Sequence, residues 1–259
     1  MSKIKPRPSQ KALLGQNIAG RYSIIEQIGE GGMGTVYKAR QEPLGRLVAF
    51  KVLLPDLVDD SLKLKRFVNE ARILSELRHP HTVSLIDFGR LSDGRLYIVM
   101  DYVHGGTLRD LMDQGRLEQT AALSIIRQIL QSLSEAHGLG IIHRDLKPAN
   151  VLVDDVENEQ FVIRVADFGI AKLDPNHEGR TLGIQNMSKE NNKFGVQAHI
   201  ATSPGIRLGT PAYIPPEQAF GKPIDARSDL YSVGVLLYEM LTGHQPFSSD
   251  TERGLCLEH

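Results

Sequence analysis

The N-terminal half of the chain alternates apolar and polar positions with the period of a β-strand. β-rich runs broken by glycine occupy residues 22–29, 34–40 and 46–54, and two further runs follow at 83–90 and 95–100. The first three runs lie close together and are joined by turn residues, which is typical of an antiparallel meander. The pattern therefore predicts a small antiparallel sheet in this half of the chain.

Apolar residues take up helical spacing between and after these strands. One predicted helix covers residues 61–79 and packs on the sheet, and two more cover 107–115 and 118–140. Residues 230–243 are nearly all apolar, which predicts a buried core helix. The stretch at 173–207 is polar, lacks periodicity and is too long for an ordinary connection. We interpret it as a regulatory loop or a locally disordered segment within a mainly helical second half.

Composition narrows the classes of protein. With 30 basic and 31 acidic residues among 259, no overall charge favours nucleic acid or an anionic membrane surface. Cys256 is the only cysteine, which excludes an intramolecular disulfide and fits a reducing compartment, so we expect a cytoplasmic protein. No apolar region follows the basic first ten residues, and the run at 230–243 is shorter than the ~18 apolar residues of a membrane span. We therefore expect neither a secretory signal nor a membrane segment in this chain.

Three glycines in the first predicted hairpin have a spacing that suits phosphate binding. Gly29, Gly31 and Gly34 carry no Cβ atom, so phosphate oxygens can approach the backbone amides. The same spacing occurs in plain hairpins and in dinucleotide-binding folds. A dinucleotide site needs a helix directly after the last glycine, whereas a β-rich run follows here. We therefore interpret the loop as a flap over nucleotide phosphates, with a plain hairpin as the alternative.

Two charged residues lie beside apolar stripes in the same half of the chain. Lys51 ends the run LVAFK inside a predicted strand, and Glu70 borders the apolar face of the helix at 61–79. An ion pair between them would direct the ammonium group toward the α- and β-phosphates of a nucleotide. Each residue alone has a simpler interpretation: a lysine that reaches water from an edge strand, and a solvated glutamate on a helix surface.

The segment IIHRDLKPANVLV, residues 141–153, places charged and amide side chains between two apolar runs. Such groups are costly to bury unless they are paired or bind a ligand. Asp145 is suited to orient a substrate hydroxyl and accept its proton, and Lys147 to neutralise a transferring phosphoryl group. Asn150, together with Asp167 of VADFGIAK, supplies oxygen ligands of the kind that Mg²⁺ prefers. The segment therefore predicts a phosphoryl-transfer site.

In this order, the motifs resemble those of the protein kinase superfamily, and most of all the eukaryotic-like (Hanks-type) serine/threonine kinases of bacteria. The resemblance implies an α+β, two-lobed protein kinase fold that lacks the last helices of the large lobe. A small antiparallel β-sheet lobe would cover residues 21–103 and a mainly helical lobe 104–259, after a disordered lead-in at 1–20. The motifs that carry the resemblance are Gly29-Gly31-Gly34, Lys51, Glu70, HRDLKPAN, DFG and GTPAYIPPE.

The resemblance implies an activity and assigns catalytic roles. The expected reaction is transfer of the γ-phosphoryl group of ATP to Ser/Thr hydroxyls of proteins, with Mg²⁺ or Mn²⁺ as cofactor. Asp145 would be the catalytic base, Lys51 and Glu70 would form the ion pair of the active state, and Asn150 and Asp167 would hold the metals. A kinase-like module that binds nucleotide or a partner without transferring phosphate remains the alternative.

Further positions take their roles from the same resemblance. Lys147 and Thr210 indicate Ser/Thr acceptors, Asp229 would accept hydrogen bonds from the backbone of the catalytic loop, and His143 would stack with Phe168. The adenine pocket would be formed by Val36, Ala49, Met100, Asp101, Val103 and Leu152.

Regulation and the chain end complete the expectations. Arg144 precedes the catalytic aspartate, so it could capture a phosphate on the activation segment at 167–217, with Thr202 or Ser203 as the expected site of autophosphorylation. The family continues with helices that supply an arginine partner for Glu217, and this chain stops before them. We therefore expect an unpaired carboxylate there, and either self-association through the uncovered face of the helical lobe or a partner that covers this face.

Overall fold

The computed structural model describes residues 13–31, 34–53, 71–72, 74–154, 161–168 and 211–259. Two compact units divide the chain: an N-terminal unit of Met1–Lys65 and Leu85–Tyr102, and a C-terminal unit of Arg66–Ser84 and Val103–His259. This division differs from the predicted lobes because residues 66–84 belong with the C-terminal unit. Outside the described residues lie Glu70, most of the predicted helix at 61–79, the expected phosphorylation sites Thr202 and Ser203, and Thr210.

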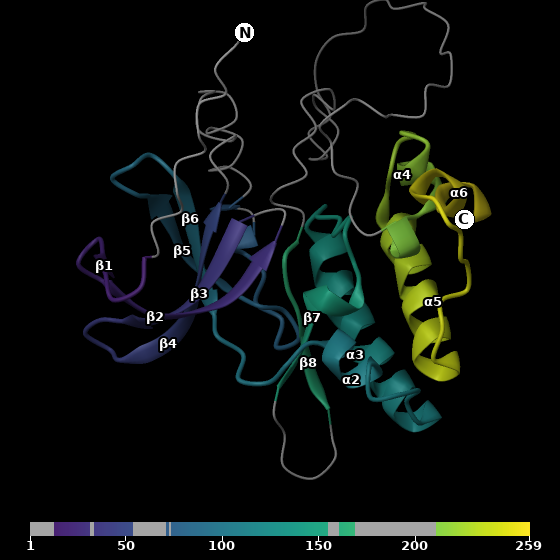
Figure 1. Ribbon diagram of the computed structural model, residues 1–259, viewed down its shortest axis with the longest axis horizontal. Helices are drawn as coiled ribbons and strands as arrows, with labels where there is room; N and C mark the ends of the chain where they lie inside the picture. Colours follow the sequence, from purple (N-terminus) through teal and green to yellow (C-terminus); the bar gives the residue numbers. More distant parts are fainter. Residues whose placement is uncertain (1–12, 32–33, 54–70, 73, 155–160, 169–210) are drawn as a thin grey trace, which may run out of the picture. The chain divides into compact units, whose positions relative to one another are not determined.

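Six antiparallel strands form the sheet of the N-terminal unit, in the order β1-β2-β3-β4-β6-β5 (Figure 1). The sheet is a meander up to β4, and then β6 takes the place beside β4 while β5 becomes the edge strand. The predicted meander is therefore confirmed. The strands are β1 (Asn17–Ile18), β2 (Tyr22–Gly31), β3 (Gly34–Gln41), β4 (Arg46–Leu53), β5 (Leu85–Arg90) and β6 (Leu96–Asp101).

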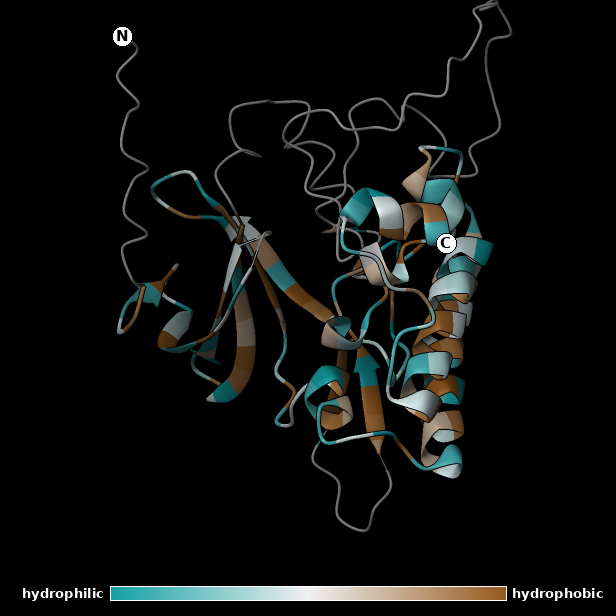
Figure 2. Cartoon of the chain, turned by 45° about the vertical axis from the view of Figure 1, so that its right-hand side comes forward, coloured by the Kyte–Doolittle hydropathy of each residue, from teal (hydrophilic) through white to brown (hydrophobic). Residues whose placement is uncertain are grey.

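One face of this sheet forms the hydrophobic core of the N-terminal unit. Phe50 of β4 is fully buried, stacks on Tyr97 with ring centroids 4.7 Å apart, and contacts Tyr22 at 5.7 Å. Hydrophobic residues, brown in Figure 2, run along these strands. Because successive side chains point to opposite faces of a strand, the residues between the core positions face the other way. The second face is therefore available for other contacts.

The expected disordered lead-in at 1–20 is wrong for its last eight residues. Residues 17 and 18 pair with β2, and Gly15 N donates to Ile24 O at 3.0 Å. Leu13 is 5% exposed and belongs to the core cluster. Burial of this leucine and the added strand pairing supply the physical reason, because they repay the entropy of ordering a short segment.

The C-terminal unit is mainly helical. Its two longest helices, α3 and α5, pack on each other, and α3 also packs on the β7–β8 pair (Figure 1). The short helices α4 and α6 lie together at one end of α5. The elements are α2 (Leu108–Met112), α3 (Gln119–Gly138), η2 (Pro148–Asn150), β7 (Val151–Asp154), β8 (Val162–Val165), η3 (Pro211–Tyr213), α4 (Pro216–Ala219), α5 (Ala226–Thr242) and α6 (Glu252–Glu258).

Helix α5 is bounded by strong capping signals. The Asp225 side chain accepts a hydrogen bond from Arg227 N at 2.9 Å, and Gly243 ends the helix with φ 80°. Between the caps, Val233, Leu236 and Met240 are buried as predicted for a core helix. The opposite side exposes 49% of Leu230 and 41% of Tyr238. Part of the apolar surface of α5 therefore faces solvent in this chain.

Glu217 has a partner that the sequence analysis did not anticipate. The Ser228 hydroxyl, on the first turn of α5, donates a short hydrogen bond to the Glu217 carboxylate. The expectation of an unpaired carboxylate is therefore wrong. A serine hydroxyl satisfies one carboxylate oxygen, but it does not supply the positive charge of the arginine that the protein kinase superfamily places there.

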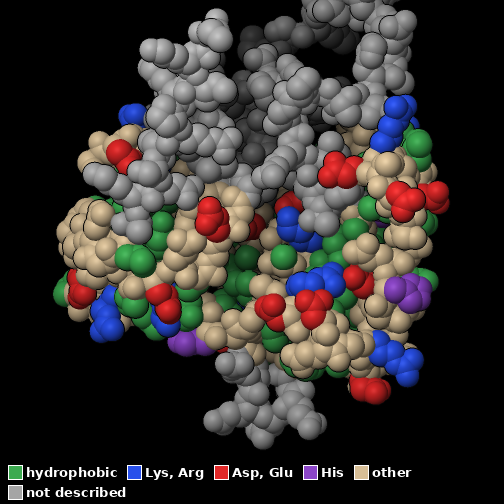
Figure 3. All heavy atoms as spheres, viewed as in Figure 1, with side chains coloured by type: hydrophobic (Ala, Val, Ile, Leu, Met, Phe, Trp, Pro, Cys, Tyr) green, Lys and Arg blue, Asp and Glu red, His purple; other side chains and the backbone are tan. Residues whose placement is uncertain are grey.

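The surface shows mixed charge. On the face drawn in Figure 3, acidic and basic side chains lie next to one another over both units. Within the described ranges, no helix combines the length and apolar character needed to span a membrane.

Candidate active site

The loop between α3 and β7 holds Asp145 in a defined position. Its carboxylate accepts a hydrogen bond from Lys147 Nζ at 3.0 Å, and Asn150 Nδ2 lies 3.3 Å from the same Oδ2 atom. Asn150 Nδ2 also donates to Asp145 O at 2.8 Å. Asp145 is 9% exposed and Asn150 7%. Three residues predicted from the sequence therefore meet at the Asp145 carboxylate. Because the amide nitrogen of Asn150 is hydrogen-bonded to Asp145, the amide oxygen of Asn150 can face a cation.

His143 lies at the centre of this loop and connects it to the end of β8. Its Nε2 atom is 3.0 Å from Ala166 O, its Nδ1 atom accepts from Asp145 N at 3.3 Å, and its ring lies 4.7 Å from the Phe168 ring. Burial lowers the pKa of His143, because a charged imidazolium is poorly solvated there. The neutral ring with hydrogen on Nε2 satisfies both contacts. The predicted stacking of His143 on Phe168 is confirmed.

Asp229 of α5 holds the backbone of the same loop through hydrogen bonds. Its carboxylate accepts from His143 N at 2.8 Å and from Arg144 N at 2.9 Å, which confirms the prediction. His137, at the end of α3, adds a contact from Nε2 at 2.7 Å. Arg144 has φ 64°, a left-handed conformation that is strained for a residue with a side chain. The two amide hydrogen bonds to Asp229 therefore hold a backbone turn that would otherwise relax.

Asp167 follows β8, and the backbone just before it is hydrogen-bonded to the loop that carries Asp145. Val165 pairs with Val151 in the β7–β8 ladder, and Ala166 N donates to Asn150 O at 2.8 Å. Asp167 itself has φ 59°, again in the left-handed region. The structure therefore brings Asn150 and the residue preceding Asp167 into direct contact. A carboxylate and an amide oxygen form a donor set that fits Mg²⁺ or Mn²⁺.

In the N-terminal unit, four of the residues predicted to surround ATP share one face of the sheet, whereas Asp101 pairs with the core residue Val48. Val36 is paired with Lys51, and Ala49 with Met100, across neighbouring strands. Cross-strand partners lie on the same side of a sheet, so all four are on the face opposite the core. Gly29 is paired with Val36 and belongs to this face as well. The sequence motifs therefore converge on one surface within this unit.

The three glycines of the first hairpin differ in whether packing within the sheet leaves space for a Cβ atom. A Cβ atom on Gly34 would lie 2.0 Å from Val52 O, and its φ is 144°. At Gly29 the nearest atom to such a Cβ is Val36 Cβ at 3.8 Å, and at Gly31 no atom in the described part of the chain lies within 4 Å. The sheet itself therefore requires Gly34, whereas packing leaves room for a side chain at Gly29 and Gly31.

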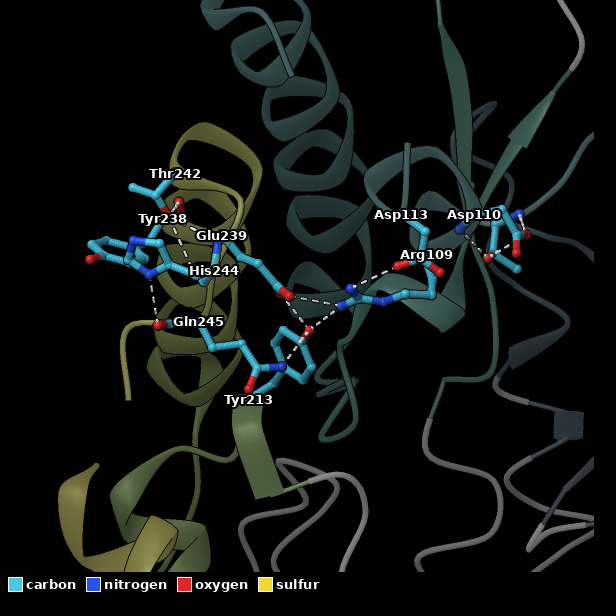
Figure 4. Close-up of polar contacts among 10 residues, drawn as sticks. Arg109, Asp110, Asp113, Tyr213, Tyr238, Glu239, Thr242, His244 and Gln245 are labelled. Atoms are coloured by element: carbon cyan, nitrogen blue, oxygen red, sulfur yellow. Dashed lines mark hydrogen bonds and ion pairs between the residues drawn. The ribbon is translucent and has the colours of Figure 1, made fainter. Parts of the chain in front are cut away.

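A buried polar cluster connects α2, η3 and α5 (Figure 4). Arg109 Nη2 donates to Tyr213 Oη at 2.6 Å and to Glu239 Oε1 at 3.0 Å, and Tyr213 Oη donates to Glu239 Oε2 at 2.5 Å. Ser232 Oγ donates to Tyr213 O at 2.8 Å. Burial, followed by the hydrogen bond to Glu239, raises the pKa of Tyr213, so the phenol keeps its proton. The cluster therefore fixes both the backbone and the side chain of Tyr213.

No motif or periodicity in the sequence predicts this cluster. The available signal was Glu239, the only acid within the apolar run at 230–243. A single carboxylate on a buried helix needs a partner, but the sequence does not show which of its arginines supplies it.

The predicted residues are thus distributed over both units. Asp145, Lys147, Asn150 and Asp167 belong to the C-terminal unit, as do Val103 and Leu152 of the predicted adenine pocket. Lys51, the glycines and the remaining pocket residues belong to the N-terminal unit. Their convergence around a single nucleotide stays a prediction, and so does the pair of Lys51 with Glu70.

An antiparallel sheet bearing a glycine hairpin and a buried lysine, followed by a helical unit with this aspartate loop, defines a protein kinase domain. Residues 22–256 match the protein kinase domain family, so the chain belongs to that family. The solved structures agree: the kinase domain of PknI from Mycobacterium tuberculosis superposes with a TM-score of 0.66 and 28% identity, over 90% of this chain and 78% of that one. A crystal structure of Rad53 in complex with AMP-PNP has a TM-score of 0.67 over 92% of this chain and 52% of that one, with 28% identity.

Two similar relatives within the family are bacterial serine/threonine-protein kinases. Serine/threonine-protein kinase pkn3 of Myxococcus xanthus is 41% identical over 254 residues, which cover 97% of this chain and 43% of the relative. Serine/threonine-protein kinase PrkC of Bacillus subtilis is 38% identical over 248 residues, which cover 95% of this chain and 34% of the relative. The chain thus spans less than half the length of these curated relatives.

Proposed function

We propose that this domain transfers the γ-phosphoryl group of ATP to serine or threonine hydroxyls of proteins. The observation that carries the proposal is the buried Asp145 carboxylate, held between Lys147 and Asn150 and one backbone hydrogen bond away from the segment that bears Asp167. The names of the relatives and the nucleotide analogue bound to Rad53 support the same reaction.

The roles follow from the chemistry of each group. The Asp145 carboxylate orients the acceptor hydroxyl and takes its proton while the bond from oxygen to the γ-phosphorus forms and the bond to the β-bridging oxygen breaks. Lys147, 3.0 Å from that carboxylate, offsets the negative charge on the transferring group. Asn150 and Asp167 would hold Mg²⁺ or Mn²⁺, which neutralises phosphate charge when it is bound.

ATP would bind on the second face of the sheet. Lys51 would pair with Glu70 and contact the α- and β-phosphates, while Gly29 and Gly31 would let the backbone approach the phosphates. The adenine ring would lie against apolar side chains, with backbone hydrogen bonds from residues 101–103. The proposed pocket consists of Val36, Ala49, Met100, Asp101, Val103 and Leu152.

Alanine at two of the glycines should separate ligand binding from folding. Gly31→Ala is expected to change the free energy of unfolding by less than about 0.5 kcal/mol and to weaken ATP binding several-fold, because its Cβ meets no atom of the described residues within 4 Å. Gly34→Ala is expected to destabilise the domain by ~2 kcal/mol or more, because its Cβ overlaps Val52 O. Urea denaturation and isothermal titration with ATP check both. Normal ATP affinity in a stable Gly31→Ala protein would contradict the flap.

Activation is proposed to involve phosphorylation of the chain by itself. Arg144 lies directly before Asp145, so a phosphate on the activation segment could bind its guanidinium group. The proposed acceptors, Thr202 and Ser203, lie outside the described residues. Intact-mass analysis after incubation with ATP and Mg²⁺ tests the activity, and mass spectrometry of proteolytic peptides locates the site. Nucleotide binding without any mass increase, on the chain or on a protein substrate, would favour a module that binds without transfer.

The proposed setting is the bacterial cytoplasm, and the proposed partners include a second copy of the chain. The exposed apolar side chains of α5, Leu230 and Tyr238, form the surface proposed for self-association. Sedimentation velocity is expected to show a concentration-dependent dimer that Leu230→Glu removes. A monomer across the whole concentration range would contradict this proposal.

A further inference from the structure

The segment at 78–83 lies beside the end of β8 and forms a parallel β-bridge between Thr82 and Val165. Val83 N donates to Val165 O at 2.9 Å, and Val165 N donates to His81 O at 2.9 Å. Val165 is the last residue of β8 and stands two positions before Asp167. The segment at 78–83 therefore supports the backbone that leads directly to the proposed metal ligand.

A single carboxylate on α3 holds the start of this segment. Glu135 accepts from Arg78 N at 3.1 and 3.2 Å, through its two oxygens, and from His79 N at 3.0 Å. Hydrogen bonds from consecutive amides to one carboxylate are charge-assisted and therefore stronger than neutral ones. One turn earlier on α3, the Ser132 hydroxyl lies 2.7 Å from the Thr82 hydroxyl, and both are buried. Helix α3 therefore holds the segment near both of its ends, through Glu135 and Ser132.

The same helix reaches β8 by an independent route. Gln128 Nε2 donates to Phe161 O at 2.8 Å, and Ile163 N donates to Gln128 Oε1 at 3.0 Å. These bonds fix the start of β8, whereas the bonds from residues 81 and 83 fix its end. The end of the strand is therefore held by two neighbours, its partner Val151 in β7 and the segment that Glu135 holds.

Asp167 needs this support because its own backbone is strained. A left-handed φ of 59° persists in a non-glycine residue only when its surroundings hold it. The residue before it is fixed on both sides: Ala166 N donates to Asn150 O at 2.8 Å, and His143 Nε2 contacts Ala166 O at 3.0 Å. The residue before that, Val165, is held by its pairing with Val151 and by the hydrogen bonds with residues 81 and 83.

We propose that Glu135 is a positioning residue for Asp167. Its carboxylate sets the backbone at residues 78–79, this segment sets Val165, and Val165 sets the orientation of the Asp167 carboxylate toward a divalent cation. The inference rests on the proposed role of Asp167 as a metal ligand. It assigns an effect on metal binding to Glu135, a residue of α3 that lies outside the sequence motifs.

Amide hydrogen exchange tests the structural part. In Glu135→Ala, exchange at Val83, Val165 and Ala166 is expected to accelerate about tenfold or more, while Ile163, held by Gln128, keeps its wild-type rate. In Glu135→Gln, which retains one acceptor oxygen, exchange at these three amides is expected to be faster than in the wild type and slower than in Glu135→Ala. This variant replaces Glu135→Ala if the alanine variant does not fold. Glu118→Ala is the matched control, since this exposed residue starts the same helix and makes no capping hydrogen bond. Unchanged exchange at Val165 and Ala166 would overturn the proposal.

Metal binding tests the functional part. In the presence of AMP-PNP, the apparent Kd for Mg²⁺ is expected to rise about tenfold in Glu135→Ala and less in Glu135→Gln, as for other residues that orient ligands. Affinity for the nucleotide without metal should stay within about twofold, which a general loss of folding would not allow. A parallel loss of both affinities would overturn the proposal. If the wild-type domain binds no nucleotide, the proposed function fails, and the exchange rates alone decide whether Glu135 positions this backbone.

Discussion

Asp145→Asn is expected to lower the rate of phosphoryl transfer by about 10³-fold while the domain remains folded and binds ATP. Asparagine has nearly the same shape, and its oxygen can still accept the hydrogen bond from Lys147 that the carboxylate accepts at 3.0 Å. It cannot accept a proton from the substrate hydroxyl, because a neutral amide is not a base at neutral pH. The loss should therefore appear in the rate of transfer and not in the affinity for ATP.

Single-turnover transfer of radiolabelled phosphate and isothermal titration with ATP separate these two quantities. Asp250→Asn makes the same chemical change at an exposed position and should leave both unchanged. Transfer by Asp145→Asn within tenfold of wild type would remove Asp145 from the chemistry. Equal and negligible transfer by the wild type and by Asp145→Asn would favour a domain that only binds nucleotide.

Asp229→Ala is expected to have the largest effect on stability, a loss of ~3–5 kcal/mol in the free energy of unfolding. The carboxylate is 1% exposed and accepts two backbone amides and the His137 ring. Alanine would leave these donors buried without an acceptor, and each unsatisfied donor is costly. Arg144, with φ 64°, would lose the amide hydrogen bond that holds its strained turn. Transfer should therefore fall with stability.

Urea denaturation measures this loss, and Asp225→Ala supplies the control on the same helix. Asp225 is the N-cap of α5, and its pKa is lowered to about 2, mainly by the hydrogen bond from the Arg227 side chain. Removing a cap costs ~1 kcal/mol, so a much larger loss in Asp229→Ala would come from the buried network and not from the helix. Similar losses in the two variants would contradict the anchoring role of Asp229.

Most of the fold could be predicted from the sequence because its signals are local. Period-two runs gave β2 to β6, and helical spacing gave α2, α3 and α5 within a few residues of their bounds. The strand β1 was not predicted, because two residues are too few to show a period. Its stability comes from pairing with β2 and from burial of Leu13, and both are tertiary contacts.

The site was predictable where a motif fixes both residue type and spacing. Asp145, Lys147 and Asn150 meet as their spacing indicates. The supporting residues could not be found in the same way. Glu135 and Glu239 become meaningful only once the fold brings distant donors to them, at residues 78–79 and at Arg109. Ser228 in contact with Glu217 is a similar case, because a serine gives no sequence signal of a carboxylate partner.

The left-handed backbones at Arg144 and Asp167 also bear on how such a chain can change over generations. Glycine would relieve the local strain at either position and could raise stability, yet it would delete a guanidinium or a carboxylate that the reaction is proposed to use. Selection for a more stable protein and selection for a working one therefore favour different residues at these two places. A stabilised variant obtained without screening for activity is expected to acquire glycine there and to lose phosphoryl transfer.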